Sequence, residues 1–170
     1  MLIYDGIELI PIEMEDINIL NKWKNDEEIF KYLGGGYRPT SISQQKKWIE
    51  SMTENTLENQ RYMILNEEKQ KVGFIGLYGI SLIHRTCTWG IYIGEKKCWG
   101  KGIASRAYKA LENYAKEYLN IRKIKLEVVK ENEKALKSYE KLGFNICGEF
   151  KQDRFIKGEY KDVLFMEKFI

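Results

Sequence analysis

The chain has 170 residues, of which 44% are hydrophobic and 31% are charged, and its formal net charge at pH 7 is +3. This composition and length are typical of one soluble globular domain, which we place at residues 1–170. The small net charge argues against a nucleic-acid partner, and no apolar run approaches the roughly 18 residues that a membrane-spanning helix needs.

The N-terminal third of the chain predicts a strand, a broken helix and a second helix. Residues 7–12 alternate loosely and suit an opening strand. Apolar residues then recur at helical spacing over residues 17–30, with a break at Asn25-Asp26. The glycines at 34–36 predict a flexible loop, and residues 41–44 fit a capping box that opens the second helix.

The central part of the chain predicts antiparallel strands over residues 61–66, 72–80 and 86–93. Three glycines interrupt the second of these strands. Glycines inside a strand indicate a bulge or a close approach of another backbone. These glycines are Gly73, Gly76 and Gly79.

The C-terminal half predicts a helix, a strand, a short helix and two closing strands. The first helix follows Gly102, and Asn132 is suited to cap the second helix, which Gly143 ends. The strands are expected at residues 123–129, 144–150 and 160–169. The core stripe of the first helix is predicted to be Ile103, Ala107, Ala110, Leu111, Tyr114 and Tyr118. All elements together predict an α+β fold, with a mixed sheet and helices packed on its faces.

The N-terminus and the cysteines predict a cytoplasmic protein without a bound metal. Residues 1–6 lack a basic segment followed by an apolar stretch, so we expect no signal peptide. Cys87, Cys98 and Cys147 are odd in number and lack the spacing of a disulfide framework or a zinc site.

The turn at residues 97–104 has the chemistry of a pyrophosphate cradle. Gly100 and Gly102 have no Cβ, so backbone amides there can approach a ligand closely. The helix that follows directs its unpaired N–H groups at the same place, and Lys97 and Lys101 attract an anion. An ordinary strand-to-helix turn is the alternative interpretation.

Two motifs in this half of the chain resemble those of the GCN5-related N-acetyltransferase (GNAT) superfamily. Residues 97–102 fill its pyrophosphate motif, Gln/Arg-x-x-Gly-x-Gly/Ala, with lysine at the first place. Its second motif, Asn-x-x-Ala followed by Tyr and Gly-Phe, matches residues 132–135, Tyr139 and residues 143–144. The resemblance covers residues 72–170. The N-terminal third is similar to the ribosomal-protein-alanine and spermidine acetyltransferase branch.

The resemblance implies a GNAT-like sheet of six to seven mostly antiparallel strands that is splayed in the middle. It also implies direct transfer of an acetyl group from acetyl-CoA to a primary amine of a small molecule or a protein N-terminus. No metal is implied, and a homodimer is common among members. The implied acetyl-CoA-binding residues are Ile91, Tyr92, Ile93, Lys97, Trp99, Gly100, Lys101, Gly102, Ile103, Ala104, Ser105, Asn132, Ala135 and Ser138.

The resemblance places Tyr139 near the thioester sulfur, where it would act as general acid. A phenol with a pKa of about 10 can protonate a thiolate whose thiol has a pKa of about 8.5 as charge develops on the sulfur. A core tyrosine is the alternative. A backbone N–H, such as that of Ile93, would polarise the carbonyl. Thr88 stands where many relatives carry a glutamate that serves as general base. A water relay or a distant carboxylate such as Glu149 would have to take over that role.

The acceptor and the broader function have several alternatives at this stage. A polyamine such as spermidine or spermine needs carboxylates, and the predicted substrate loop at residues 32–43 holds Arg38 and no acidic residue. A protein N-terminus, an amino sugar and an amine antibiotic remain open as acceptors, and a polyamine is the alternative. A non-catalytic acetyl-CoA sensor, a dinucleotide-binding module and an enzyme that acetylates aminoacyl-tRNA are the rival functions. His84 is predicted to be a surface residue, and Cys98 to fill space.

Overall fold

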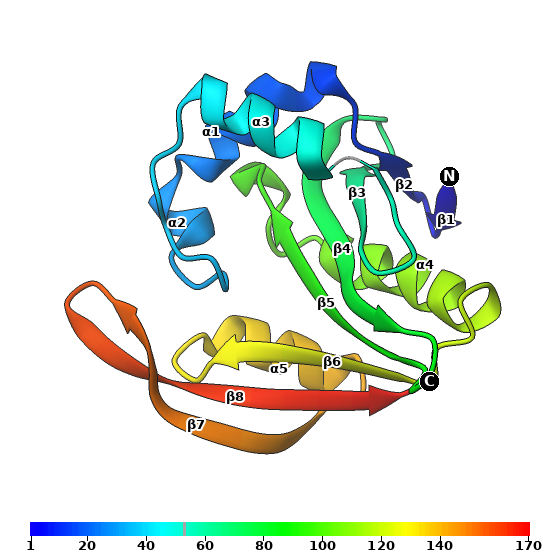
Figure 1. Cartoon of the computed structure of the whole chain (residues 1–170), viewed down its shortest axis with the longest axis vertical. Helices are drawn as coiled ribbons and strands as arrows, with labels where there is room; N and C mark the ends of the chain where they lie inside the picture. The colour runs from blue at the N-terminus through cyan, green and yellow to red at the C-terminus, as the bar shows by residue number, and fades with distance from the viewer. Residues whose placement is uncertain (53) are drawn as a thin grey trace.

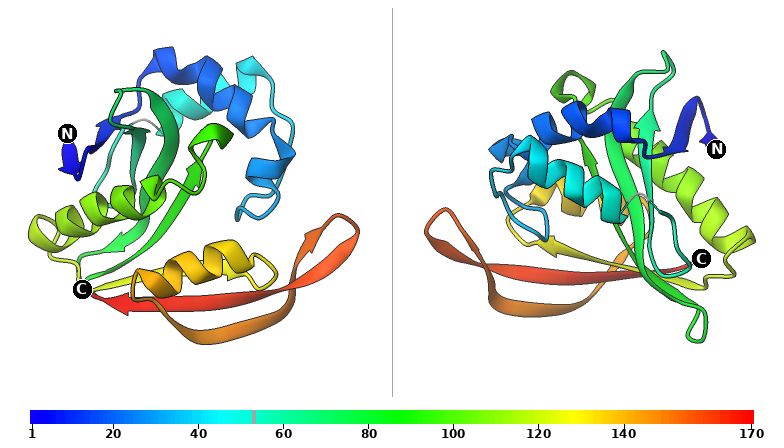
Figure 2. Two further views of the ribbon diagram at one scale, coloured as in Figure 1. Left: turned by 180° about the vertical axis from the view of Figure 1, so that it is seen from behind. Right: turned by 45° about the horizontal axis from the view of Figure 1, so that its top comes forward.

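The computed structural model describes residues 1–52 and 54–170 and contains an eight-stranded sheet with helices on both faces (Figures 1 and 2). The strand order is β1-β2-β3-β4-β5-β6-β8-β7. Neighbouring strands are antiparallel except β5 and β6, which are parallel. The predicted α+β architecture is confirmed, and the sheet is wider than expected because a short N-terminal strand was missed.

The elements have the following bounds. The strands are β1 (Leu2–Tyr4), β2 (Ile7–Pro11), β3 (Gln60–Leu65), β4 (Lys71–Ser81), β5 (Thr86–Ile93), β6 (Lys123–Val129), β7 (Asn145–Ile156) and β8 (Glu159–Phe169). The α-helices are α1 (Ile17–Lys24), α2 (Glu27–Phe30), α3 (Ile42–Met52), α4 (Ile103–Glu117) and α5 (Glu133–Lys141), and short 3-10 turns lie at η1 (Met14–Asp16) and η2 (Lys96–Cys98). None of the helices in the described ranges has the length and apolarity to cross a membrane.

Capping side chains set the helix boundaries that the sequence predicted. Asp26 accepts a hydrogen bond from the backbone N–H of Glu28 at 3.0 Å, which starts α2 immediately after the break. Ser41 and Gln44 each accept from the other's backbone N–H, at 3.2 and 3.0 Å. This reciprocal pair is the predicted capping box of α3.

The two faces of the sheet carry separate hydrophobic clusters. Helices α4 and α5 cover one face with α4 residues such as Ala107 and Leu111, whereas α1 to α3 cover the other with Trp23 and Ile49. The predicted core stripe of α4 is wrong at Tyr118, which is 77% exposed. Tyr118 is the C-cap residue, so it lies beyond the last helical turn, and Tyr108 and Ala115 are buried instead.

The glycines of β4 lie at close backbone approaches and at a register shift, as the sequence predicted. A Cβ on Gly73 would collide with the backbone oxygen of Tyr92, and one on Gly76 would collide with that of Gln60. The neighbouring strands therefore approach β4 more closely than a side chain would allow. Gly79 has a φ of +54° and lies where the pairing of β4 with β5 shifts register.

The central feature of the sheet is the separation of β5 from β6. The two strands pair only over Thr86–Thr88 and residues 123–125. Beyond this point β5 continues beside β4 as far as Ile93, and β6 continues beside β8 as far as Val129. Figure 1 shows the two strands converging near the C-terminus and diverging away from it. The implied splay of the sheet is therefore confirmed.

Gly94, directly after β5, is a position where the packing requires the absence of a side chain. A Cβ there would overlap the ring of Trp23, which is fully buried. We predict that Gly94→Ala lowers the free energy of unfolding by about 1–3 kcal/mol, because overpacking forces neighbouring groups to move. Denaturant unfolding measures the change. Gly35→Ala is the matched control, because no atom lies within 4 Å of its Cβ position; an equal loss in both variants would contradict the packing argument.

Candidate active site

The glycine turn after β5 leaves open space in front of the N-terminus of α4, which has no side-chain cap. Gly100 and Gly102 have φ angles of +74° and +72°, and no heavy atom lies within 4 Å of either Cβ position. Gly102 is the N-cap of α4 and offers no side chain to the first amides of the helix. The N–H groups of residues 103–105 therefore lack intrahelical partners and lie beside the exposed Lys97 and Lys101. This arrangement suits an anion.

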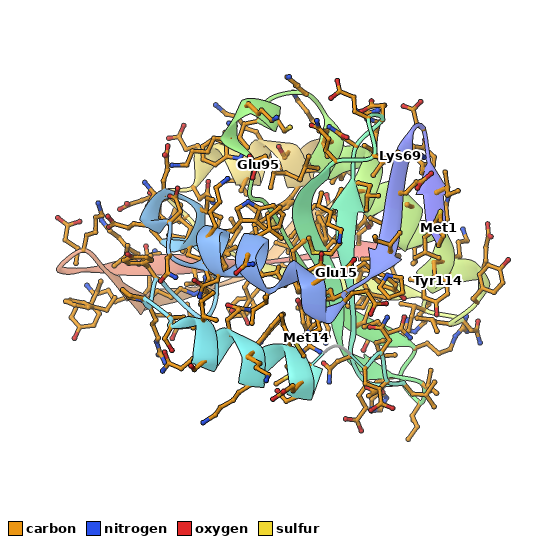
Figure 3. All side chains as sticks on the ribbon, turned by 90° about the horizontal axis from the view of Figure 1, so that it is seen from above. Met1, Met14, Glu15, Lys69, Glu95 and Tyr114 are labelled. Carbon is orange, nitrogen blue, oxygen red and sulfur yellow. The ribbon has the colours of Figure 1, made fainter. Side chains whose placement is uncertain are left out.

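Buried contacts hold the turn in place at the end of β5. The indole N–H of Trp99 donates to the carbonyl oxygen of Ile93 at 2.8 Å, and that of Trp23 donates to the Glu95 carboxylate at 3.0 Å. This hydrogen bond from Trp23 contributes most to the lowered pKa of Glu95, which Figure 3 labels in the turn. Cys98 is 5% exposed, consistent with its predicted packing role. The turn is therefore anchored from both faces of the sheet.

The main chain of β5 alternates between β4 and the gap beside β6. The N–H of Gly94 donates to the carbonyl of Val72 in β4. Because main-chain groups alternate sides along a strand, those of Ile91 and Ile93 face the gap. The side chain of Tyr92 lies on the α1–α2 face of the sheet, stacked on Phe74 with ring centroids 5.4 Å apart. Of the three predicted residues, Ile91 thus turns both main-chain groups to the gap and Ile93 turns its N–H there, while the Ile93 carbonyl accepts from Trp99. Tyr92 supports the strand by packing.

The start of α5 lies close to the glycine turn, although the two are separated by about 30 residues. The ammonium of Lys134 is 5.3 Å from the ring centroid of Trp99. Asn132 accepts a hydrogen bond from the N–H of Ala135 at 3.4 Å and so caps α5 as predicted. Ala135 and Asn132 are half-buried, and Ser138 is exposed. The two sequence motifs therefore meet at the same opening.

Tyr139 is part of an aromatic cluster on the α5 side of the gap. Its ring lies 5.6 Å from that of Trp89 and 6.3 Å from that of Phe144. Burial raises the pKa of Tyr139 to about 12, so the phenol is protonated at neutral pH. Within the described part of the chain, the Tyr139 hydroxyl forms no side-chain hydrogen bond, and the Trp89 indole N–H is buried without a partner. Tyr139 therefore has a free hydroxyl proton to donate.

The structure gives no support to Glu149 as the general base. Lys130 and Lys151 each donate to its carboxylate, at 2.8 and 2.9 Å, and these hydrogen bonds lower the pKa of Glu149. The residue lies on β7, the edge strand of the sheet. Thr88 is the last residue of β5 that pairs with β6, and it is half-buried.

A cavity of 520 Å³ lies between the glycine loop and the β7–β8 hairpin. The hairpin residues at 153–157 are more than 110 positions from the loop, so no local sequence signal indicates this pairing. Its charged lining residues are Glu27, Lys31, Arg38, Asp153, Arg154 and Lys157. Glu27 and Asp153 supply the carboxylates that residues 32–43 lack. Lys157 forms an ion pair with Glu27 at 2.9 Å.

Arg154, which lines this cavity, links the segment after α2 to strand β6. Its Nη1 donates to the backbone carbonyl of Tyr32 at 3.1 Å, and its Nη2 donates to the Glu127 carboxylate of β6 at 2.9 Å. The guanidinium is mostly buried, with 17% of the side chain exposed. Neither Arg154 nor Glu127 was identified from the sequence, because only the fold brings them to the site.

The described residues contain no group of three or more His, Cys, Asp or Glu side chains that could hold a metal ion. The expectation of a metal-free site stays a prediction.

Comparison with known proteins agrees with both the motifs and the fold. The family described as acetyltransferase (GNAT) domain matches residues 7–145. The spermidine N(1)-acetyltransferase of Escherichia coli K12 is 30% identical over 173 residues, covering 95% of this chain and 84% of that protein. The acetyltransferase PseH of Campylobacter jejuni is 23% identical over 145 residues, covering 85% of this chain and 87% of that protein.

A solved structure extends the likeness to three dimensions. The spermidine N-acetyltransferase from Vibrio cholerae, in complex with CoA and spermine, matches with a TM-score of 0.87 and 27% identity, over 96% of this chain and 95% of that one. The motifs, the opened sheet and these matches favour an enzyme over the sensor and dinucleotide-binding alternatives. The chain belongs to the GNAT family, and it is an acetyl-CoA-dependent N-acetyltransferase.

Proposed function

We propose that the glycine turn and the first turn of α4 bind the pyrophosphate of acetyl-CoA, and that the free edge of β5 binds its pantetheine arm. Two left-handed glycines, an uncapped helix N-terminus and two exposed lysines support the first part. The gap-facing main chain of Ile91 and Ile93 supports the second. Asn132 and the half-buried Ala135 would line the opposite side of the opening.

Tyr139 is the proposed general acid. Its phenol stays protonated at neutral pH, it has no competing side-chain partner in the described ranges, and it lies on the α5 side of the gap. The main-chain N–H of Ile93 would polarise the thioester carbonyl. Attack by a neutral amine forms the C–N bond, the C–S bond breaks, and Tyr139 gives its proton to the departing sulfur.

A polyamine of the spermidine or spermine type is the proposed acceptor, although the sequence of residues 32–43 argued against it. The observation that carries this proposal is the cavity between the glycine loop and the β7–β8 hairpin, which brings Glu27 and Asp153 to that loop. Carboxylates attract alkylammonium groups. Relatives aligned along nearly the whole chain are spermidine acetyltransferases, which supports the same substrate class.

A second candidate acceptor is a primary amine on a molecule that also carries an anionic group, such as a phosphorylated amino sugar. The basic residues of the cavity outnumber its two carboxylates, which favours this class. Arg154 and Lys157 pair with Glu127 and Glu27, whereas Lys31 and Arg38 have no carboxylate partner among residues 1–52 and 54–170.

The proposal also includes a cytoplasmic location, a single domain and a homodimer. Three free cysteines and the use of acetyl-CoA are consistent with the reducing cytoplasm. The edge strand β7 exposes Ile146 and Phe150, at 51% and 57%, and an exposed apolar edge strand favours pairing with a second copy. Light scattering that gave the mass of a single chain would contradict the dimer.

We predict that Gly102→Glu weakens acetyl-CoA binding by at least about tenfold. The glutamate would place negative charge at the α4 N-terminus, where the pyrophosphate is proposed to bind, and repel it. Isothermal titration calorimetry measures the affinity. Gly158→Glu is the control, because Gly158 has a similar φ of +82° and equally open surroundings but lies in the β7–β8 turn. Unchanged affinity in Gly102→Glu would contradict the site.

We predict that Tyr139→Phe lowers kcat by about 10²-fold or more while the affinity for acetyl-CoA changes little, because only the proton donor is lost. Steady-state kinetics and calorimetry give the two quantities. Tyr118→Phe, on an exposed tyrosine outside the site, should retain the wild-type kcat. A wild-type rate in Tyr139→Phe would remove this residue from the acid role.

We predict that spermidine and spermine are acetylated with a kcat/KM at least about tenfold above that of amines bearing a carboxylate or phosphate, a difference of about 1.4 kcal/mol. The measurement is thiol release from acetyl-CoA over a panel that includes glucosamine 6-phosphate and an alanyl peptide, with mass detection of products. The reverse order would support the second candidate. Binding of acetyl-CoA without thiol release for any amine would argue against the proposed function.

A further inference from the structure

Trp89 is the first residue of β5 beyond the pairing of this strand with β6. The last paired residue is Thr88, and Trp89 continues opposite Leu77 of β4. Its side chain belongs to the hydrophobic cluster that α4 and α5 cover, and it is 4% exposed. The indole is therefore buried at the point where the sheet opens, on the face that carries α5.

The indole N–H of Trp89 is a buried donor without an acceptor. In the described part of the chain, two buried side-chain polar atoms lack a hydrogen-bond partner, and they are this N–H and the Tyr108 hydroxyl. By contrast, the indole N–H groups of Trp23 and Trp99 both donate hydrogen bonds. Because a buried donor that stays unpaired costs free energy, the unpaired N–H at this place needs an explanation.

Tyr139, the proposed general acid, lies beside this donor. The rings of Trp89 and Tyr139 meet edge to face, with centroids 5.6 Å apart and planes at 75°. Phe144 completes the cluster, since its ring centroid lies 6.0 Å from that of Trp89 and 6.3 Å from that of Tyr139. Of these two aromatic neighbours of Tyr139, only Trp89 carries a hydrogen-bond donor.

The apolar surroundings make Tyr139 a weak acid for its proposed role. Burial raises the pKa of Tyr139 to about 12. The thiol that must form has a pKa of about 8.5, so full transfer of the proton to the sulfur runs uphill by roughly three to four pKa units. The cost arises because the phenolate is poorly solvated in this cluster. A donor that bonds to the oxygen as charge develops lowers that cost.

We propose that Trp89 is a positioning residue for the reaction, whose indole N–H donates to the Tyr139 oxygen as the phenol gives up its proton. This inference rests on the proposed function and adds a donor to it. Hydrogen bonds of this kind are often long before substrate binds and shorten in the transition state. Since the bond to a developing phenolate is stronger than the bond to a neutral phenol, it stabilises the transition state more than the ground state.

The step balances with the rest of the reaction. The ammonium of the acceptor loses one proton to solvent, the neutral nitrogen forms the C–N bond with the thioester carbon, and the C–S bond breaks. The sulfur takes the proton of Tyr139, and the phenolate accepts the hydrogen bond from Trp89, which keeps its own proton. The second proton lost from nitrogen then restores the phenol through solvent. The net products are the acetamide, the free CoA thiol and one proton.

The test compares Trp89→Phe with the wild type on the strongest acceptor of the amine panel. Phenylalanine keeps an aromatic ring at this position and removes the N–H. We expect kcat to fall about 10- to 100-fold, as for one lost hydrogen bond to a charged group, with the KM for acetyl-CoA within about twofold of wild type. Trp48→Phe is the matched control. Trp48 packs against Phe74 on the other face of the sheet, so this variant should retain the wild-type kcat.

A double-mutant cycle separates this role from support of the fold. If the N–H acts through the Tyr139 oxygen, Trp89→Phe combined with Tyr139→Phe should be at most about twofold slower than Tyr139→Phe alone. A structural role would multiply the two losses, because loosened packing slows the reaction whichever side chain stands at position 139. Tyr108→Phe removes the other buried group without a partner and should leave kcat within about twofold of wild type.

A second variant covers the case in which Trp89→Phe does not fold, as judged by circular dichroism and acetyl-CoA titration. The isosteric amino acid 3-benzothienylalanine at position 89 keeps the bicyclic shape of the indole and replaces only the N–H, with sulfur. Its kcat should show the same loss, because the donor is again missing.

Three results would overturn the proposal. The first is a wild-type kcat in Trp89→Phe, or in the benzothienyl variant if the first is unfolded. The second is a pair of losses that multiply in the double variant. The third is a loss in Tyr108→Phe as large as that in Trp89→Phe, which would make Tyr108 the partner of the indole. Each of these leaves the proposed function intact, whereas a wild-type rate in Tyr139→Phe refutes the acid role itself and this inference with it.

Discussion

The short parallel pairing of β5 with β6 is the constraint on which the rest of this molecule depends. Three residues on each strand pair, and then each strand follows its antiparallel neighbour away from the other. Beyond Thr88, the edge of β5 toward β6 keeps main-chain donors and acceptors without a strand partner. Such an edge can bind an extended ligand by main-chain hydrogen bonds, in the manner of an added strand.

Packing contacts hold in place the groups that border this gap. At one end, Trp99 and Gly94 anchor the glycine turn against β5 and Trp23, so that the N-terminus of α4 faces the opening. The aromatic cluster of Trp89, Tyr108, Tyr139 and Phe144 supports the α5 side of the gap. Rigid supports of this kind favour catalysis because they position reacting groups before substrate arrives.

The acceptor side has a different character, since ion pairs rather than a hydrophobic core join its parts. Arg154 links the loop after α2 to β6, and Lys157 links the hairpin to α2. The exposed ion pair of Lys157 with Glu27 contributes little stability, and its two members can exchange partners with a charged ligand. This contact can therefore hold the hairpin near the loop and still yield to the amine that we propose as acceptor.

The sequence by itself determined the elements whose signals are local. Glycines at the turn, the helix break at Asn25-Asp26, the caps at Ser41 and Asn132, and the α5 face carrying Tyr139 could be predicted because neighbouring residues fix their geometry. The tertiary structure alone decided where the two arms of the sheet part and which charges meet in the cavity. Arg154 and Asp153 carry no local motif, and their position beside the loop after α2 depends on a pairing between segments more than 110 residues apart. Local chemistry is encoded in adjacent residues, whereas long-range pairing is decided by the packing of the whole core.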